Sequence, residues 1–211
     1  MKSLKRYFKP ALLVYSREEG EKKVAFIAKR YPRAWVHIDV MDHEFVPNTC
    51  WCSASGFAGL EIKNPQEIHL MVLHPEKYLK KWKRAGAQRI VFHFESTHAP
   101  IQVARAIRKL GMEAVIALNP DTPVIKVRLL LNEIDGILFM GVYPGLAGQK
   151  FIPATILKIK KARAYAATKP ITVDGGVTFQ NAADLIDAGA TELVSTSAIF
   201  GERFKKKSRP V

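Results

Sequence analysis

The sequence contains little that would place the chain in a membrane or cross-link it. Its apolar runs are all shorter than the roughly 20 residues that cross a bilayer, so no membrane-spanning segment is expected. Residues 1–6 are basic and lead into no apolar leader segment, which predicts a cytoplasmic protein. The only cysteines, Cys50 and Cys52, stand too close for a framework disulfide, and no other Cys or His pair completes a zinc motif. We expect both to be thiols in a loop.

Acidic residues are also scarce, since 19 Asp and Glu face 33 Lys and Arg and give a net charge of +14. Such a charge attracts polyanions and steers phosphorylated substrates, but it does not determine a fold. The basic residues are dispersed along segments that we expect to be helical, and they gather only at 205–209. We therefore predict a basic, poorly ordered tail at 204–211 after one domain at 1–203, and nucleic acid is not the expected main partner.

A Gly-x-Gly-x-x-Gly motif after the first expected strand is missing, which argues against an open dinucleotide-binding sheet. The sequence instead alternates short apolar segments with amphipathic ones, as in a parallel sheet covered by helices. We predict strands within residues 12–15, 35–42, 67–73, 89–95, 113–118, 136–142, 171–176 and 192–197. Helices are predicted at 17–30, 75–85, 101–110, 124–132, 154–167 and 181–188. Eight strands in 211 residues favour an α/β fold with a single-domain (β/α)₈ TIM barrel and a shortened eighth helix.

The most unusual stretch is the expected strand at 35–42. Residues two apart share a face of a strand, so His37, Asp39 and Met41 lie together. A buried imidazole beside a buried carboxylate needs a partner, such as a metal ion or a proton-transfer site. A surface strand with a chance His and Asp would explain the same residues.

Further polar residues stand at the carboxyl ends of other expected strands, where barrels of this fold carry their active sites. His69 and Asp174 would join His37 and Asp39 there, and two imidazoles with two carboxylates form a complete ligand set for a divalent transition metal. The alternatives are a hydrogen-bonded core histidine and a capping aspartate. Small residues near the last strands are candidates for binding phosphate through backbone N–H groups: Gly145, Gly148, Gly175, Gly176, Thr196 and Ser197.

Several longer motifs stand in a fixed order along the chain. They are His37-Ile38-Asp39-Val40-Met41-Asp42 with Phe45-Val46-Pro47-Asn48, His69-Leu70-Met71-Val72, Leu118-Asn119-Pro120, Met140-x-Val142-x-Pro144-Gly145-x-x-Gly148, Val173-Asp174-Gly175-Gly176-Val177 and Ser197-Ala198-Ile199-Phe200. Taken together, these motifs resemble the ribulose-phosphate 3-epimerase family, and the resemblance covers about residues 34–201.

This resemblance implies an isomerase that inverts C3 of a ketose phosphate, by default D-ribulose 5-phosphate to D-xylulose 5-phosphate. It implies one divalent metal ion (Zn, Fe, Mn or Co) held by His37, Asp39, His69 and Asp174. The same two aspartates would exchange protons with opposite faces of the sugar through an enediolate. A wall around this intermediate would be formed by the methionines Met41, Met71 and Met140.

The sequence departs from the family's pattern in the residues that read the substrate. The first strand reads Pro10-Ala11-Leu12-Leu13 and lacks the family's serine, Tyr143 replaces an asparagine, and Thr196-Ser197 replaces Gly-Ser. An alternative is therefore a divergent barrel with weak or no catalysis that binds polyanions through its basic residues, including 205–209. A barrel decarboxylase fits less well, because it would need a lysine in place of the histidines. The oligomeric state stays open, with a homo-oligomer as one alternative.

Overall fold

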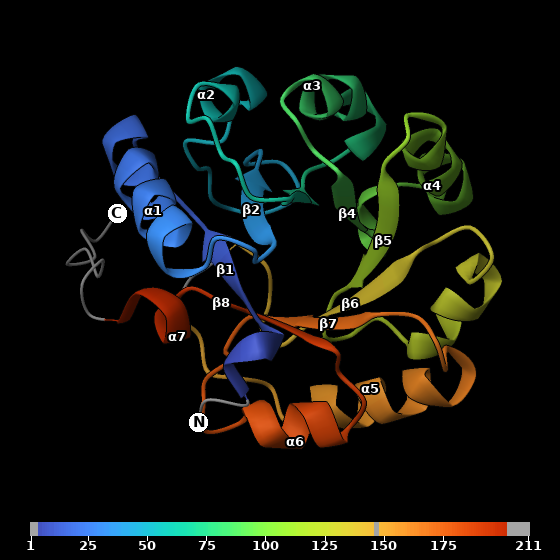
Figure 1. Ribbon diagram of the computed structural model, residues 1–211. Coiled ribbons are helices and arrows are strands. Elements are labelled where there is room, and N and C mark those ends of the chain that lie inside the picture. The colour runs from blue at the N-terminus through green and yellow to red at the C-terminus, as the bar shows by residue number, and fades with distance from the viewer. Residues whose placement is uncertain (1–3, 146–147, 202–211) are drawn as a thin grey trace.

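Eight parallel strands close into a barrel in which each strand pairs with its neighbours in sequence and β8 pairs with β1 (Figure 1). The structure, a computed structural model of the 211-residue chain, describes residues 4–145 and 148–201. The strands are β1 (Phe8–Leu12), β2 (Val36–Met41), β3 (Gln66–Met71), β4 (Arg89–His93), β5 (Glu113–Leu118), β6 (Gly136–Met140), β7 (Ile171–Asp174) and β8 (Glu192–Ser195). The predicted (β/α)₈ barrel is confirmed.

Helices surround the barrel. The α-helices are α1 (Arg17–Arg30), α2 (Ala54–Ala58), α3 (Leu79–Arg84), α4 (Pro100–Lys109), α5 (Ala154–Tyr165), α6 (Ala182–Asp187) and α7 (Ser197–Phe200). The 3₁₀ helices are η1 (Leu4–Tyr7), η2 (Pro75–Lys77), η3 (Phe94–Ser96) and η4 (Val124–Leu130). The helix predicted at 124–132 is present as the 3₁₀ helix η4, and the segment at 49–65 contains a short helix that was not predicted. None of the described helices is long and apolar enough to cross a membrane.

The eighth helix, α7, is as short as predicted within the described part of the chain. Two further predictions, the domain boundary at 203 and the poorly ordered basic tail at 204–211, lie outside the described residues.

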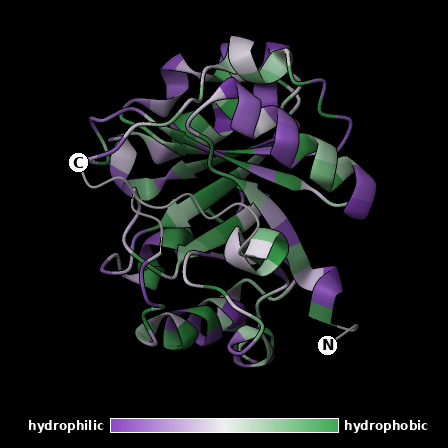
Figure 2. Cartoon of the chain, turned by 90° about the vertical axis from the view of Figure 1, so that its left-hand side faces the viewer, coloured by the Kyte–Doolittle hydropathy of each residue, from purple (hydrophilic) through white to green (hydrophobic). Residues whose placement is uncertain are grey.

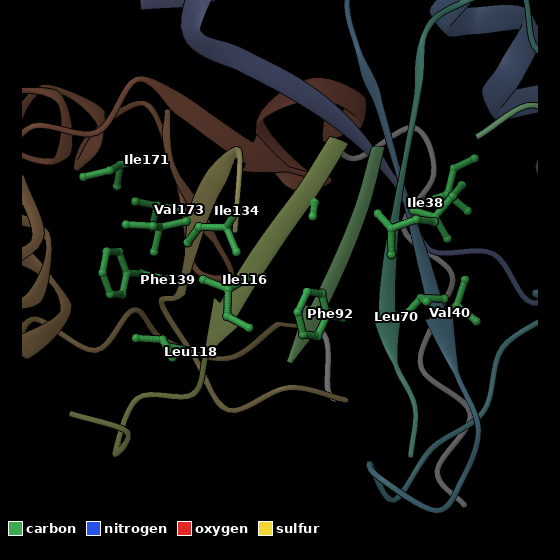
Figure 3. Packing of buried hydrophobic residues seen from close by; sticks show 14 of the residues in the cluster. Ile38, Val40, Leu70, Phe92, Ile116, Leu118, Ile134, Phe139, Ile171 and Val173 are labelled. Atoms are coloured by element: carbon green, nitrogen blue, oxygen red, sulfur yellow. The ribbon is translucent and has the colours of Figure 1, made fainter. Parts of the chain in front are cut away.

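The main core fills the space between the barrel and its helices. Every second strand residue points outward into it, as Ile38, Val40, Leu70 and Phe92 show in Figure 3. Figure 2 shows mostly hydrophobic residues along the strands, whereas the surrounding helices carry both hydrophilic and hydrophobic residues. A parallel sheet covered by helices is buried on both faces, and the outward face of this one is covered by apolar, mostly β-branched and aromatic side chains. The alternate residues point into the barrel and form the site.

The interior of the barrel has two chemically different sides. One side is apolar and is filled by Val91, Val115, Ala117, Leu138, Met140 and Val142. The other side carries buried polar and charged side chains on β1, β2, β3, β4, β7 and β8. The interior of such a barrel is normally filled by layers of aliphatic side chains. A half that carries charged side chains therefore marks a specialised region.

The first strand begins four residues earlier than the prediction at 12–15. Lys9 and Pro10 disfavour a buried strand when the sequence is read locally, because one is charged and the other lacks a backbone N–H. In the structure Lys9 is buried and pairs with Glu67 at 2.9 Å and Glu192 at 2.5 Å. These partners are 58 and 183 residues away in sequence, so local patterning could not reveal them.

The prediction of two thiols at Cys50 and Cys52 is wrong, because the structure joins them in a disulfide. Their Cα atoms lie 5.2 Å apart, within the range that a disulfide needs although one residue separates them. The backbone N–H of Met41 also donates to Sγ of Cys50 at 3.4 Å. The disulfide therefore lies beside the end of β2 and does not connect distant parts of the barrel.

Candidate active site and metal centre

Four donor side chains meet inside the barrel near the carboxyl ends of the strands. Nε2 of His37 and Nδ1 of His69 lie 3.1 Å apart. Oδ1 of Asp39 lies 3.4 Å from the His37 nitrogen and 3.2 Å from that of His69. Oδ2 of Asp174 lies 3.6 and 3.4 Å from the same two atoms. All four ligand atoms lie within 4.8 Å of one another, so the structure brings together the four residues predicted as ligands.

Strand register accounts for this convergence. His37 and Asp39 alternate on the inner face of β2, and Asp39 is the register partner of His69 on β3. Asp174 ends β7, where its register partner on β6 is Met140. The closed barrel then brings β7 across its axis to face β2 and β3. The closed barrel thus brings His69 and Asp174, from two other strands, to the predicted pair His37 and Asp39.

The four groups distribute charge in a way that suits metal binding. Burial lowers the pKa of His37, but hydrogen bonds to Asp174, Asp39 and Glu67 outweigh it and raise this pKa well above its usual value. His69 behaves alike, so its pKa is also raised. Burial favours the neutral acids, yet the two histidines hold the pKa values of Asp39 and Asp174 below the usual range. A divalent cation would replace the protons that the imidazoles share with these carboxylates.

Behind His37 lies a buried charge cluster that sequence reasoning missed. Nδ1 of His37 contacts Oε1 of Glu67 at 2.7 Å, and Oε2 of Glu67 accepts from Lys9 and Arg89, each at 2.9 Å. Burial raises the Glu67 pKa, but Lys9, His37 and Arg89 together lower it well below its ordinary value. Glu67 is therefore an anion, and it orients His37 as carboxylates that bind the outer nitrogen of metal-binding imidazoles do. Its position two residues before His69, on the same face of β3, is the sequence signal that could have found it.

His93 was also missed, and it lies directly behind His69. It ends β4 with no exposed surface, and its Nε2 lies 2.9 Å from Nε2 of His69. Burial and the neighbouring His69 lower the pKa of His93, although Glu95 and Asn119 act in the opposite direction. His93 is therefore a neutral imidazole, and each predicted histidine ligand has a buried partner at its second ring nitrogen.

Above the four donors lies a cavity of about 550 Å³. It is lined by all the other residues predicted for the site and by the two aspartates: Asp39, Met41, Met71, Met140, Gly145, Gly148, Asp174, Gly175, Gly176, Thr196 and Ser197. The predicted histidine ligands do not line it, since His37 and His69 are fully buried beneath its floor. Only the carboxylates, whose side chains are 11% and 15% exposed, open from the donor set onto the cavity.

The glycines on one side of the cavity are needed for close backbone packing. Gly175 and Gly176 have φ angles of 93° and 66°, in the left-handed region that favours glycine. A Cβ at Gly176 would lie 2.7 Å from Cα of Phe151, and one at Gly175 would collide with the side chain of Val142. The loop thus presents bare backbone to the cavity, as a phosphate-binding loop does.

The opposite wall is apolar and reflects a departure noted in the sequence. Met41, Val46 and Met71 form a buried cluster with Leu13 against it. Ala11 is the register partner of His37 on β1, so a methyl group occupies the position at which the family's motif has a serine hydroxyl. On this side the cavity itself is lined by Leu13, Met41 and Met71.

Comparison with known sequences decides the family. The model of the ribulose-phosphate 3 epimerase family matches residues 8–200. The chain belongs to the ribulose-phosphate 3-epimerase family. It is 36% identical over 179 residues to the ribulose-phosphate 3-epimerase of Bacillus subtilis, covering 82% of each chain. It is 34% identical over 195 residues to that of Schizosaccharomyces pombe, covering 90% of this chain and 85% of the relative.

Another family member extends well beyond the matched region. The chloroplastic ribulose-5-phosphate-3-epimerase of Arabidopsis thaliana is 38% identical over 176 residues, which are 80% of this chain and 63% of the plant protein. The prediction that the chain is a member of an isomerase family is confirmed.

Among solved structures, a mutant tryptophan synthase alpha-subunit from Pyrococcus furiosus matches with a TM-score of 0.71 and 13% identity. The match covers 94% of this chain and 91% of that one, and at this identity it shows the shared fold alone.

Proposed function

We propose that this epimerase-family protein inverts C3 of a ketose phosphate, D-ribulose 5-phosphate by default, with a divalent metal ion and with Asp39 and Asp174 as proton carriers. The observation that carries the proposal is the position of these two carboxylates. They are the only members of the four-donor set that reach the cavity, and they approach it from β2 and β7 on opposite sides of the barrel. A sugar carbon between them is accessible to a proton acceptor on each face.

The donor set fits a transition metal ion. Two imidazole nitrogens and two carboxylate oxygens suit zinc, iron, manganese or cobalt. Carboxylate pairs buried together are costly unless positive charge compensates them. His37, Asp39, His69 and Asp174 would hold the ion, which when bound supplies the positive charge that stabilises developing oxyanions of the substrate.

Asp39 and Asp174 would perform the proton transfers. The lowered pKa values favour the ionised form of each carboxylate, which can accept the weakly acidic proton beside the substrate carbonyl. For inversion the pair enters the step with one proton between them. The ionised carboxylate removes the C3 proton, which leaves a planar enediolate, and the protonated one gives its proton to the opposite face, so the pair again holds one proton and the carbon is inverted.

The rest of the cavity would protect and position this intermediate. Met41, Met71 and Met140 line its wall with polarisable, apolar side chains, which exclude water that would protonate the enediolate at random. The bare backbone at Gly175 and Gly176 would bind the phosphate, although Thr196 adds a side chain where the family's motif has glycine. This replacement leaves a related ketose phosphate open as the preferred substrate.

Removal of divalent metal is expected to abolish turnover. Protein dialysed against a strong chelator should not convert ribulose 5-phosphate to xylulose 5-phosphate, and Zn²⁺, Fe²⁺, Mn²⁺ or Co²⁺ should restore conversion. The assay couples xylulose 5-phosphate formation to a detecting enzyme, and elemental analysis reports bound metal in each sample. Full turnover by protein shown to be free of metal would disprove the metal requirement and leave an acid/base epimerase.

The Gly176→Ala variant is expected to weaken substrate binding. The added methyl group would press on the backbone of Phe151 and displace the phosphate-binding loop, so the KM for ribulose 5-phosphate should rise roughly tenfold, or by about 1.4 kcal/mol. Gly111→Ala is the matched control, because Gly111 has a similar φ of 70° but lies beyond α4, away from the cavity. Steady-state kinetics should show an unchanged KM in the control. Equal KM values in both variants would show that the loop does not bind the phosphate.

A further inference from the structure

Three buried polar atoms without a hydrogen-bond partner among the described residues belong to residues of one cluster, behind His69. They are Nδ1 of His93, Oε2 of Glu95 and Oδ1 of Asn119. The first two face each other at 3.4 Å. The other carboxylate oxygen of Glu95 is fixed, because it accepts from the Asn119 backbone N–H at 2.9 Å and from the Thr122 hydroxyl. Buried polar atoms in a native fold are almost always paired, so this cluster needs a specific proton arrangement.

The contact between the two histidines supplies that arrangement. Their Nε2 atoms are 2.9 Å apart, and the ring planes differ by 16°. The ring centroids are 5.1 Å apart, so they are farther apart than the two nitrogens by nearly the width of one imidazole ring. The rings therefore meet edge to edge with the two nitrogens pointing at each other, which is the geometry of a hydrogen bond rather than of a stack. One nitrogen must donate and the other must accept.

The position of the four-donor set decides which nitrogen donates. Nδ1 of His69 faces Asp39, Asp174 and His37, so a metal ion bound there takes the Nδ1 lone pair and the ring proton resides on Nε2. This Nε2–H donates to Nε2 of His93, whose own proton must then lie on Nδ1. That proton faces Oε2 of Glu95 across 3.4 Å, so it gives two of the three atoms, Nδ1 of His93 and Oε2 of Glu95, a polar contact.

We propose that His93 is a positioning residue for the metal ligand His69, acting through a chain from His69 to His93 to Glu95 that fixes the tautomer and the ring orientation of the ligand. The inference rests on the proposed function, because it concerns the same metal site. The chain differs from the partner of His37, which is a carboxylate anion at 2.7 Å. His37 thus contacts the anion Glu67 directly, whereas His69 contacts the neutral His93, which in turn faces Glu95.

The first test reads the protons directly in the wild-type protein. The protein is labelled with ¹⁵N-histidine and loaded with Zn²⁺, and long-range ¹H–¹⁵N spectra assign the tautomer of each ring. We expect a proton on Nε2 of His69 and on Nδ1 of His93. A proton on Nε2 of His93 would overturn this inference alone, whereas failure of the wild-type protein to bind Zn²⁺ would overturn the metal site and the inference with it.

The second test compares two substitutions of similar size with Co²⁺ as the probe. His93→Gln keeps an acceptor for His69 and a donor for Glu95, whereas His93→Leu has neither. Loss of a group behind a ligand typically weakens metal binding about 10–100-fold, so His93→Leu should lose that much Co²⁺ affinity and His93→Gln should recover most of it. Val91→Ala, on the same inner face of β4, controls for lost packing.

Competition with a chromophoric chelator gives the affinities, and the visible Co²⁺ spectrum reports the ligand geometry. Equal affinities and spectra for the Gln and Leu variants would show that His93 only fills space and would overturn the proposal. If the Leu variant does not fold, wild-type affinity with His93→Gln and a marked loss with Glu95→Gln support the chain, and no loss with Glu95→Gln overturns it.

Discussion

Replacing Asp174 with asparagine is expected to lower epimerisation by about 10²–10⁴-fold, the range that general acid–base groups contribute. Asparagine has almost the same shape, but its amide can neither accept the C3 proton nor return one. It also offers a neutral oxygen in place of the anion that lies 3.4 Å from His69. The loss should therefore appear in kcat, measured by coupled detection of xylulose 5-phosphate at saturating ribulose 5-phosphate and metal.

Deuterium exchange separates proton transfer from metal binding in this variant. In D₂O, Asp39 is still present on its own side of the cavity and should exchange the C3 hydrogen of whichever epimer presents that hydrogen to it. Exchange without inversion, seen by NMR of the recovered sugar phosphate, is the expected signature. Asp187→Asn, an exposed residue of α6, is the control and should behave as wild type. Inversion by Asp174→Asn at the wild-type rate would exclude Asp174 as a proton carrier.

The fold and the convergence of His37, Asp39, His69 and Asp174 were predictable because both depend on short-range patterns. A parallel barrel shows in the sequence as repeated apolar segments, and the inner face of β2 shows as polar residues two positions apart, His37 and Asp39. In this fold the active site lies at the carboxyl ends of the strands, and this rule then selected His69 and Asp174. Each of these steps uses only the local sequence and the common geometry of the fold.

The groups behind the ligands were not predictable in that way. Glu67 stands near the start of its strand, where an acidic residue usually marks an exposed end, and its cationic partners on β1 and β4 are known only once the barrel closes. His93 has the same inward position as Val91 and lies beside Glu95, so its pattern is equally consistent with a capped strand end. Burial and pairing of charges depend on contacts between distant strands, which single-sequence patterns do not contain.

Glu67 should consequently matter for stability as well as for the site. Its carboxylate is 1% exposed and contacts His37, Lys9 and Arg89. Replacing Glu67 with glutamine keeps the shape but leaves two buried cations with one fewer anion, and breaking a buried pair in this way costs about 3–5 kcal/mol. For a chain of this length each kcal/mol corresponds to roughly 2–4 °C, so the melting temperature should fall by on the order of 10 °C.

The pH dependence gives this prediction a sign. The pKa of Glu67 in the folded protein lies well below the ordinary value of 4.5, so its stabilising charge is present above that value and is lost as the pH falls toward the folded pKa. The stability difference between wild type and Glu67→Gln should be largest near neutral pH and should shrink below about pH 4.5. Denaturant unfolding of metal-stripped protein at several pH values measures it.

A double substitution shows whether the loss comes from charge imbalance in the barrel. Lys9→Met removes one of the two cations, so Lys9→Met with Glu67→Gln should be more stable than the sum of the single losses implies, by an interaction energy of about 0.5–3 kcal/mol. Glu21→Gln, which breaks the exposed pair of Arg17 and Glu21 on α1, is the surface control and should cost no more than about 0.5 kcal/mol. Strict additivity of the two barrel substitutions would mean that Glu67 stabilises the protein through His37 and packing, and that the cations behind it do not need its charge.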